Sequence, residues 1–372
     1  MSITIRKVKN RGELKRFVRL PWKIYENDPY WVPPLIQDRM KFLDKKKGVF
    51  FEFGEAEYFL AYKNDELVGR IDAHVSSRYE QYHDGETGFF GFFECIDDKE
   101  VSNALFEAAE NWLVKKGKTK IQGPISFTLY DETGMLFKGF DSSPVILTTY
   151  NPPYYNTLLT EAGFEKAIDW YAFMVTKDSK IRPALFKVKD RILREHRIEI
   201  KPLKMKEFDK RLDEVKIIFR DAWMENWGHT PLTEAQYQQM ADELKMVVKP
   251  ELTFFAEVDG ETVGFSLTLI DANPAIKKAN GRLFPFGLFK ILLGMKKIHQ
   301  LRTLAMGVLP EYRNRGLDIV FYLKTIENGL KLGFDKSECS IIVETNQRMI
   351  KALEDLEAER YKTYRIYEKK IG

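Results

Sequence analysis

The sequence predicts an α/β protein that consists of two tandem copies of one domain. Short runs of alternating apolar residues, typical of strands, interleave with longer segments of helical spacing. The same order of segments occurs twice along the 372 residues. A chain of this length can form two or three domains. Its apolar share of 44% and charged share of 31% are typical of a soluble globular protein.

Three pairs of positions indicate the duplication. The members of each pair stand in the same local context, namely the first strand, the second strand of a hairpin, and the start of a late helix. Within each pair they are 195 residues apart, and the pairs are Ile3 with Ile198, Gly69 with Gly264, and Asn151 with Asn346. A constant spacing at three matched contexts predicts an internal repeat. We therefore expect an N-terminal domain at 1–178, a helical connector at 179–197 and a C-terminal domain at 198–372.

In the first copy, alternation at Ile3 and Ile5 predicts a half-buried strand, and a turn at Asn64–Asp65 predicts a hairpin. Gly117 stands where a helix C-cap is expected. The predicted elements are a strand at 3–5, a helix at 11–27 that breaks at Pro21 or starts again after it, a hairpin at 57–75, a strand at 88–96, a helix at 101–114, a strand at 120–125, a helix at 152–162 and a strand at 165–175.

The second copy repeats this order and carries an additional segment at 273–300. That insertion explains why Gly117 and Gly333, which end the central helices, are 216 residues apart. The predicted elements are a strand at 198–200, helices at 208–227 and 232–248, a hairpin at 252–270, an extra helix at 281–298, a strand at 303–308, a helix at 317–333, a strand at 340–344, a helix at 347–356 and a strand at 361–369.

The stretch from Thr303 to Gly333 is the most informative part of the chain. An apolar run ends at Pro310, a compact basic turn follows at 313–316, and helical spacing begins at Leu317. The N-terminus of a helix presents unpaired N–H groups and a partial positive charge, which suits a phosphate or pyrophosphate group. Glycine at 316 would allow a ligand to approach the backbone closely.

This turn resembles the pyrophosphate loop of the GNAT superfamily of acyltransferases, whose pattern is Arg/Gln-x-x-Gly-x-Gly/Ala. Arg313 and Gly316 match the pattern, and Asp318 departs from it. An acid there would repel phosphates, or would interact with the helix dipole as an ordinary first-turn acid. The order of elements resembles GNAT domains over nearly the whole chain. The resemblance implies that each copy has a mixed, mostly antiparallel twisted sheet flanked by helices, with the fourth and fifth strands splayed apart.

The resemblance also implies a site for acetyl-CoA or a longer acyl-CoA. The pyrophosphate would lie on the turn, pantetheine would bind backbone groups of the strand before it, and an asparagine would orient the thioester. The implied cofactor-binding residues are Met306, Val308, Arg313, Asn314, Arg315, Gly316 and Leu317, and the orienting residue is Asn346. The first copy has the acidic link Asp97–Glu100 in place of the turn, so we assign the site to the second copy.

Glu344 is the candidate general base, because it follows an apolar strand and precedes Asn346 at the mouth of the expected splay. A strand-end carboxylate in water is the alternative. GNAT enzymes often carry a tyrosine acid seven residues past the asparagine, where this chain has Leu353. Glu94, within an apolar strand, is expected to form a buried structural ion pair. The segment 221–229 would hold the acceptor, although core tryptophans and a surface histidine are the more usual outcome.

The extra helix at 285–298 has a wide apolar side. It could cover a long acyl chain as a lid, or lie at a membrane surface. We expect it to seal the contact between the two copies.

Composition limits the other classes of function. The net charge is +4 without a basic stripe, so no nucleic-acid partner is expected. The five histidines lack metal-ligand spacing, so no metal is expected. Two cysteines in apolar runs predict buried thiols in a reducing compartment. No signal core and no spanning run are found, so we expect a cytoplasmic protein without stable membrane insertion, as a possible homodimer.

The leading hypothesis is therefore a CoA-dependent N-acyltransferase that acts on a small amine, an amino acid or a lipid-like acceptor. The alternative is a catalytically inactive ligand-binding protein with the same fold, which the acid at position 318 and the leucine at position 353 both favour.

Overall fold

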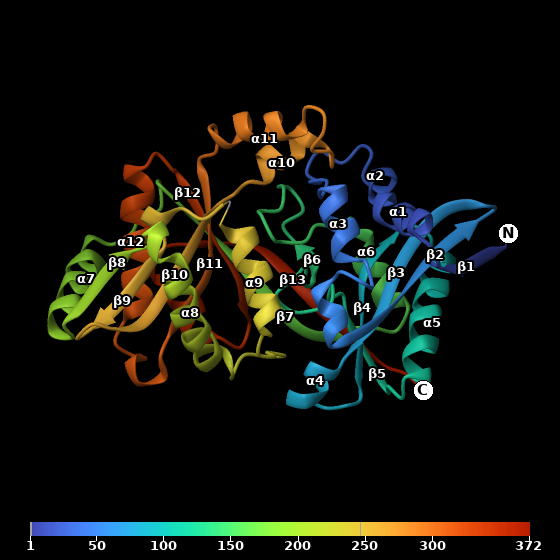
Figure 1. The fold of residues 1–372 in the computed structure, drawn as a ribbon, viewed down its shortest axis with the longest axis horizontal. Helices are drawn as coiled ribbons and strands as arrows, with labels where there is room; N and C mark the ends of the chain where they lie inside the picture. The colour runs from blue at the N-terminus through green and yellow to red at the C-terminus, as the bar shows by residue number, and fades with distance from the viewer. Residues whose placement is uncertain (1, 246) are drawn as a thin grey trace. The chain divides into compact units, whose positions relative to one another are not determined.

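A computed structural model describes residues 2–245 and 247–372 (Figure 1). The chain divides into two compact units. Unit 1 contains the residues up to Trp170 together with Asn273–Lys296 and Lys362–Gly372, and unit 2 contains Tyr171–Ala272 and Lys297–Tyr361.

Unit 1 is built on a sheet in the order β1-β2-β3-β4-β5-β13, and β6 also pairs with β13. Its pairings are antiparallel except for β4 with β5, which is parallel. The strands are β1 (Ile3–Lys7), β2 (Gly54–Lys63), β3 (Glu66–Ser76), β4 (Thr87–Cys95), β5 (Lys120–Gly123), β6 (Met135–Lys138) and β13 (Glu359–Lys370). Strand β7 (Glu165–Thr176) begins in this unit and ends in unit 2.

The helices of unit 1 cover both faces of this sheet. They are α1 (Arg11–Arg19), α2 (Pro21–Ile24), α3 (Ile36–Phe42), α4 (Ser77–Tyr82), α5 (Lys99–Lys115), α6 (Tyr154–Glu161), α10 (Asn273–Ala279) and α11 (Gly287–Met295), with a short 3₁₀ turn at Val49–Glu52. Pro21 divides the predicted helix 11–27, because proline in a helix interior clashes with the preceding turn.

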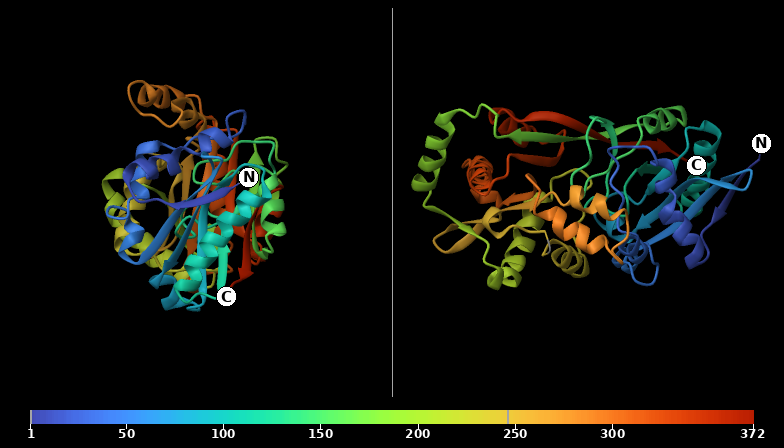
Figure 2. Two further views of the ribbon diagram at one scale, coloured as in Figure 1. Left: turned by 90° about the vertical axis from the view of Figure 1, so that its right-hand side faces the viewer. Right: turned by 90° about the horizontal axis from the view of Figure 1, so that it is seen from above.

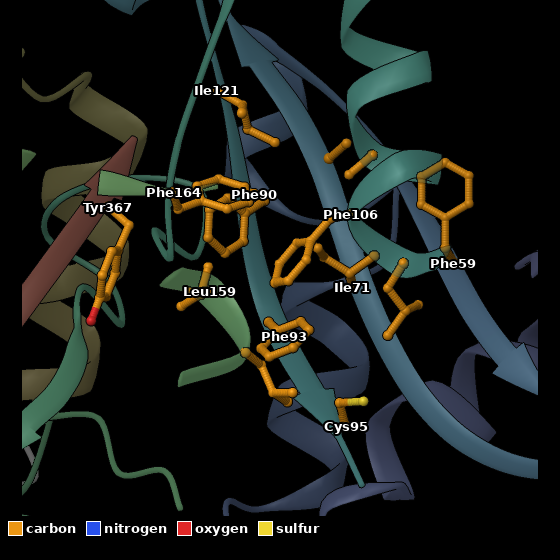
Figure 3. Close-up of a cluster of buried hydrophobic side chains, with 14 of the residues drawn as sticks. Phe59, Ile71, Phe90, Phe93, Cys95, Phe106, Ile121, Leu159, Phe164 and Tyr367 are labelled. Atoms are coloured by element: carbon orange, nitrogen blue, oxygen red, sulfur yellow. The ribbon is translucent and has the colours of Figure 1, made fainter. Parts of the chain in front are cut away.

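One face of the sheet in unit 1 packs against α5 through a cluster of aromatic and aliphatic side chains (Figure 3). The rings of Phe93 and Phe106 stack with centroids 4.8 Å apart, and Phe90 meets Phe106 edge to face at 5.8 Å. The opposite face carries a second cluster that includes Phe17 and Tyr58. Residues alternate between the two clusters along β2, as the two-residue period of a strand requires.

Unit 2 has the strand order β12-β11-β10-β9-β8, and β7 lies next to β12. These strands are β8 (Ile198–Pro202), β9 (Phe254–Val258), β10 (Glu261–Ile270), β11 (Gln300–Val308) and β12 (Lys336–Val343). Its helices are α7 (Pro183–Glu195), α8 (Phe208–Trp223), α9 (Glu234–Leu244), α12 (Leu317–Lys331) and α13 (Gln347–Asp355), with 3₁₀ turns at Met205–Glu207, Pro250–Leu252 and Pro310–Tyr312.

The predicted repeat is present in the order of elements. Strands β3 and β10, helices α5 and α12, and strands β7 and β13 hold the same places in the two halves. The α/β class and the mixed, mostly antiparallel sheet are confirmed. Inserted residues between β10 and β11 form two helices, α10 and α11, where one was predicted.

The final strand of each half enters the unit built mainly by the other half. Residues Lys362–Gly372 belong to unit 1, where β13 pairs with β5 in the register Tyr367 to Gly123. The end of β7 belongs to unit 2. The predicted division into 1–178, 179–197 and 198–372 therefore stays a prediction about the two copies, and the compact units differ from it.

Candidate functional site

The parallel strands β11 and β12 of unit 2 separate at the place that the sequence predicts. They pair from Gln300 with Lys336 to Thr303 with Cys339. Both strands continue beyond that point, to Val308 and Val343. Among the described residues they form no further pairs with each other. Backbone groups of the two strands beyond that point are therefore not used to pair the strands with each other, although the Ser340 carbonyl accepts from Arg302 at 3.4 Å.

A β-bulge lies beside the start of this separation. The register between β10 and β11 shifts so that Leu304 has no opposite residue, between Thr303 and Ala305. A bulge bends the strand and changes the direction of the side chains that follow it. The side chains of Met306 and Val308 pack with α12, and the carbonyl oxygen of Met306 accepts a 3.1 Å hydrogen bond from the indole Nε1 of Trp223.

The basic turn between β11 and α12 has an open backbone. Asn314 and Gly316 have φ angles of 62° and 76°, in the left-handed region that glycine and asparagine tolerate best. Gly316 is the N-cap of α12, and no side chain caps this helix. Asn314 is exposed, whereas the Leu317 side chain is fully buried in the apolar core. Leu317 can therefore contribute only its backbone N–H to a ligand.

Both arginines of the turn make contacts within unit 2. Arg313 donates to the carbonyl oxygens of Asp221 (3.3 Å) and Ala222 (3.1 Å) at the end of α8, and to Glu225 Oε2 (3.4 Å). Arg315 donates to the Glu311 carbonyl at 3.1 Å. The turn is thus tied through Arg313 to the segment 221–229, which the sequence analysis assigns to the acceptor.

The acid at position 318 is neutralised by a residue that sequence reasoning missed. Arg348 Nε on α13 lies 3.1 Å from Asp318 Oδ2, and Arg348 Nη1 donates to Asn314 Oδ1 at 3.0 Å. The other Asp318 oxygen accepts from the Ile319 N–H at 3.1 Å. The carboxylate is therefore a paired first-turn acid, and Arg348 adds a third guanidinium beside the turn.

The same places in the first copy are closed. The N-terminus of α5 is capped by Asp98, whose Oδ1 accepts from Glu100 N–H (3.0 Å) and Val101 N–H (3.3 Å). Parallel pairing of β4 with β5 ends at Phe89 with Gln122.

Beyond that last pair, the chain's own backbone lies against β4. The Ile125 N–H donates to the Phe90 carbonyl at 2.8 Å. A Cβ atom on Gly91 would lie only 2.3 Å from the Ile125 carbonyl oxygen, so no ligand fits between them. The capped helix and the filled strand edge both favour the second copy as the location of an acyl-CoA site.

The two predicted catalytic residues lie at the end of β12. Glu344 is half-buried, and its Oε2 accepts a hydrogen bond from the hydroxyl of Tyr171 on β7 at 3.4 Å. Asn346 is the N-cap of α13, and its Oδ1 accepts from the Met349 N–H at 3.1 Å. A role for Asn346 in orienting a thioester would therefore have to use its amide nitrogen, because the oxygen is engaged in capping.

Sequence reasoning also missed a second carboxylate, Glu338 on β12. It is fully buried, pairs across the sheet with Arg302, and accepts from the hydroxyl of Tyr361 at 2.7 Å. Burial raises the pKa of Glu338 to about 7, and the nearby Arg302 charge partly opposes that rise. The signal in the sequence was an acid directly before the mostly apolar run 339–343 of a predicted strand, which resembles the placing of Glu94 in the apolar strand β4.

The structure also tests the expectations for Glu94 and His229. Glu94 is buried, accepts from the hydroxyls of Tyr155 (2.8 Å) and Tyr25 (2.9 Å), and faces Arg70 at 3.4 Å, so the structural ion pair is confirmed. Burial raises the pKa of Glu94, despite the Arg70 charge. The expectation of a surface histidine at position 229 is wrong, because His229 is buried.

Both cysteines are buried and free, as expected. In the described part of the chain, no group of three or more His, Cys, Asp or Glu side chains is arranged to hold a metal ion. Among the same residues, no helix is long and apolar enough to cross a bilayer.

Comparison with known proteins places the chain in a family. The chain is 34% identical over 377 aligned residues to the bacterial ceramide synthase of Caulobacter vibrioides, and the match covers 100% of this chain and 98% of that protein. The chain belongs to the family of the bacterial ceramide synthase. A second relative of this chain is protein YghO of Escherichia coli, which is 35% identical over 99% of this chain and 95% of its own length. No protein-family model matches the chain.

Solved structures support the tandem GNAT fold of this ceramide synthase relative. A tandem GNAT protein from the clavulanic acid biosynthesis pathway aligns with a TM-score of 0.59 at 13% identity, over 100% of this chain and 99% of that chain. A GCN5-related N-acetyltransferase from Sphaerobacter thermophilus aligns with a TM-score of 0.54 at 13% identity, over 99% and 95%. At these identities the likeness concerns the fold alone, and it confirms two tandem GNAT domains.

Proposed function

We propose that this protein is an acyl-CoA-dependent N-acyltransferase that acts on a lipid-like amine. The full-length similarity to a bacterial ceramide synthase supports this function. Ceramide is the amide of a fatty acid with a long-chain amino alcohol, so we propose a long-chain amino alcohol as acceptor and a long-chain acyl-CoA as donor.

The observation that carries the proposal is the contrast between the two copies. In unit 2 the helix after the basic turn is uncapped and the neighbouring strands separate. In unit 1 the corresponding helix is capped by Asp98, and a chain segment lies against the strand. An uncapped helix N-terminus with nearby guanidinium groups suits a pyrophosphate.

Five of the seven predicted binding residues have a place in this proposal. The backbone N–H of Leu317 and the guanidinium group of Arg315 would bind the pyrophosphate, and Arg348 would neutralise the Asp318 carboxylate beside it. Arg313 would hold the turn in place through its contacts with α8. Backbone groups of Met306 and Val308, on the separated edge of β11, would meet the pantetheine arm.

The reaction would require two proton transfers and one acyl transfer. Glu344 would take a proton from the acceptor ammonium, and the free amine nitrogen would then attack the thioester carbon. The new C–N bond forms as the C–S bond breaks, the nitrogen releases its second proton to solvent, and coenzyme A leaves as a thiolate that takes up a proton from solvent. Tyr171 would orient Glu344 through its hydroxyl.

Two measurements test the proposal. Isothermal titration with hexadecanoyl-CoA and with acetyl-CoA measures donor binding, and mass spectrometry detects the N-acyl product formed from sphinganine. We expect the long donor to bind more tightly and the product to form. The R313A/R315A double variant should bind the donor roughly a hundredfold more weakly. It removes the charge-assisted hydrogen bonds of Arg315, which contribute about 1.5–3 kcal/mol, and the contacts by which Arg313 holds the turn.

The matched control is the R191A/R194A double variant, which removes two exposed arginines from α7 in the same unit. It should bind the donor as the natural protein does. Equal losses in both double variants, or no heat with either donor, would reject the donor site. Donor binding without product from sphinganine would favour an inactive ligand-binding protein. If product forms, an unchanged rate in E344Q would reject Glu344 as the base.

A further inference from the structure

Helices α10 and α11 form a hairpin whose packing face consists of small residues. A Cβ on Gly294 of α11 would lie 2.8 Å from the Ala275 Cβ of α10, and a Cβ on Gly287 would lie 3.3 Å from that of Ala279. Gly287 and Gly294 are also the buried residues of α11. The helices therefore approach each other closely through glycine and alanine, and the large side chains of α11 point elsewhere.

Those large side chains are exposed. Phe284 and Phe286 are each 69% exposed, Phe289 is 63% exposed and Leu292 is 58% exposed. Leu288 and Leu293 are also exposed. The segment does contact residues of the first copy through α10 and Gly281, as expected, but these large side chains take no part in that contact. An exposed apolar surface of this kind marks an interaction site.

All charged residues of the hairpin are positively charged. The segment 273–296 contains five basic residues and no acidic residue. The basic residues are Lys277, Lys278, Arg282, Lys290 and Lys296. Acidic residues are absent from the whole stretch between Asp271 and Glu311. The surface thus combines exposed aromatic and aliphatic groups with positive charge.

Unit 1 holds the hairpin firmly and displays it at its edge (Figures 1 and 2). Trp22 Nε1 donates to Asn280 Oδ1 at 2.9 Å, and the Ile36 N–H donates to the Gly281 carbonyl at 3.0 Å. Asn273 Nδ2 donates to the Pro144 carbonyl at 2.8 Å. These bonds fix both ends of α10, so the exposed side chains are presented without a need for refolding.

We infer that the α10–α11 hairpin docks on an anionic lipid bilayer, with the exposed side chains of 284–293 in the interfacial region and the exposed basic residues Arg282, Lys290 and Lys296 at the headgroups. Aromatic and leucine side chains partition into this region, and lysine and arginine attract anionic headgroups. Helix α11 has nine residues and is too short to span a bilayer. The inference does not depend on the proposed function, because it rests on exposure and charge alone.

A second copy of the chain fits this surface less well. Symmetric pairing would place five basic residues of one hairpin against five of the other, with no acidic residue on either to compensate. Desolvating like charges at such a contact opposes association. Anionic lipid supplies the missing negative charge.

Vesicle flotation with the full chain tests this inference. We expect binding to vesicles of phosphatidylcholine mixed with phosphatidylglycerol, and much weaker binding to phosphatidylcholine alone. The F286S/F289S variant should bind at least about tenfold more weakly, since it removes the apolar anchor. The K290Q/K296Q variant should lose roughly twentyfold in binding to the anionic vesicles, because each basic residue contributes a factor of about five.

The control is V114S/L330S, which removes two exposed apolar side chains elsewhere on the surface and should float as the natural chain does. Equal binding to neutral and anionic vesicles would overturn the inference, as would equal losses in the control. Sedimentation velocity provides the other decisive result. Self-association of the natural chain that F286S/F289S abolishes, without vesicle binding, would assign the surface to a second copy instead.

Discussion

Arg348 changes the meaning of the acid at position 318. From the sequence alone, an aspartate in the first turn of α12 suggests repulsion of phosphates. In the structure its carboxylate is paired with Arg348 at 3.1 Å and is largely buried, so its charge is compensated where it lies. The two residues are 30 positions apart, and nothing in the local pattern connects them.

The pairing predicts a specific pattern of donor binding. R348A should weaken acyl-CoA binding roughly tenfold, because it leaves the Asp318 carboxylate unpaired near the proposed phosphate position. The R348A/D318N double variant should recover most of that loss, since the uncompensated charge is gone. Titration calorimetry on the natural chain and the variants measures both effects. A double variant as weak as R348A would mean instead that Arg348 acts by direct contact with the ligand.

Glu338 predicts a dependence of stability on pH. Its pKa is raised from 4.5 to about 7 in the folded chain. Between these values the unfolded chain loses the proton while the folded chain keeps it. Stability is therefore highest at low pH and falls as pH rises towards 7, by on the order of 3 kcal/mol in total.

E338Q should remove this pH dependence. Glutamine is neutral and can still accept the hydrogen bond from Tyr361. Relative to the natural chain, the variant should thus gain on the order of 3 kcal/mol between pH 4.5 and pH 8. Chemical denaturation at the two pH values measures the difference, and E261Q, an exposed position in the same unit, serves as the control. A constant difference between E338Q and the natural chain would contradict the prediction.

At the scale of elements, the turn before α12 depends on a left-handed glycine next to α7. Gly316 has a φ angle of 76°, and a Cβ there would lie 2.7 Å from Ile192 Cδ1. Gly333, at the other end of α12, has a φ angle of 85° and no atom within 4 Å of its virtual Cβ. A side chain at either position would strain the left-handed backbone, but only at Gly316 would it also clash with a neighbouring side chain.

Alanine substitution at each glycine tests this difference. G333A should lose about 1 kcal/mol of stability from the left-handed backbone alone. G316A should lose about 1 kcal/mol more, and adding I192V, which deletes the Cδ1 atom, should recover that extra loss. Thermal denaturation measures the three variants. Equal losses in G316A and G333A would show that α7 yields to the added methyl group.

Elements were the part of this protein that the sequence predicted best. The strand, basic turn and helix from 303 to 333 appear where apolar spacing placed them, because that pattern depends on neighbouring residues only. The bulge at Leu304 and the hydrogen bond from Trp223 to Met306 were not predicted. Both depend on strand register and on contacts between residues far apart in the sequence.

At the scale of the whole molecule, each half of the chain contributes its final strand to the unit built mainly by the other half. This exchange determines whether one half can fold without the other. The two-copy fold followed from the repeat spacing. The compact units could not be predicted, because apolar alternation predicts a strand but does not show which sheet the strand joins. Residues 362–372 supply unit 1 with a strand and with Tyr367 and Ile371, which are buried in its core (Figure 3).

A fragment of residues 1–178 should therefore not fold cooperatively by itself. It lacks the β13 strand that pairs with β5, and an unpaired strand edge with missing core residues is both unstable and prone to aggregate. Co-expression with residues 179–372 should restore a soluble complex. Near-ultraviolet circular dichroism and size-exclusion chromatography report the two outcomes. A sharp melting transition in the isolated fragment would contradict this expectation.

The crossing of β7 into unit 2 has a consequence for the history of the protein. Tyr171, which the first copy encodes, contacts the carboxylate proposed as base in the second. The first copy is therefore needed even though it has no phosphate turn. Because each half supplies a strand to the unit of the other, deletion of either half would leave neither unit complete, so a simple deletion could not have reversed the duplication.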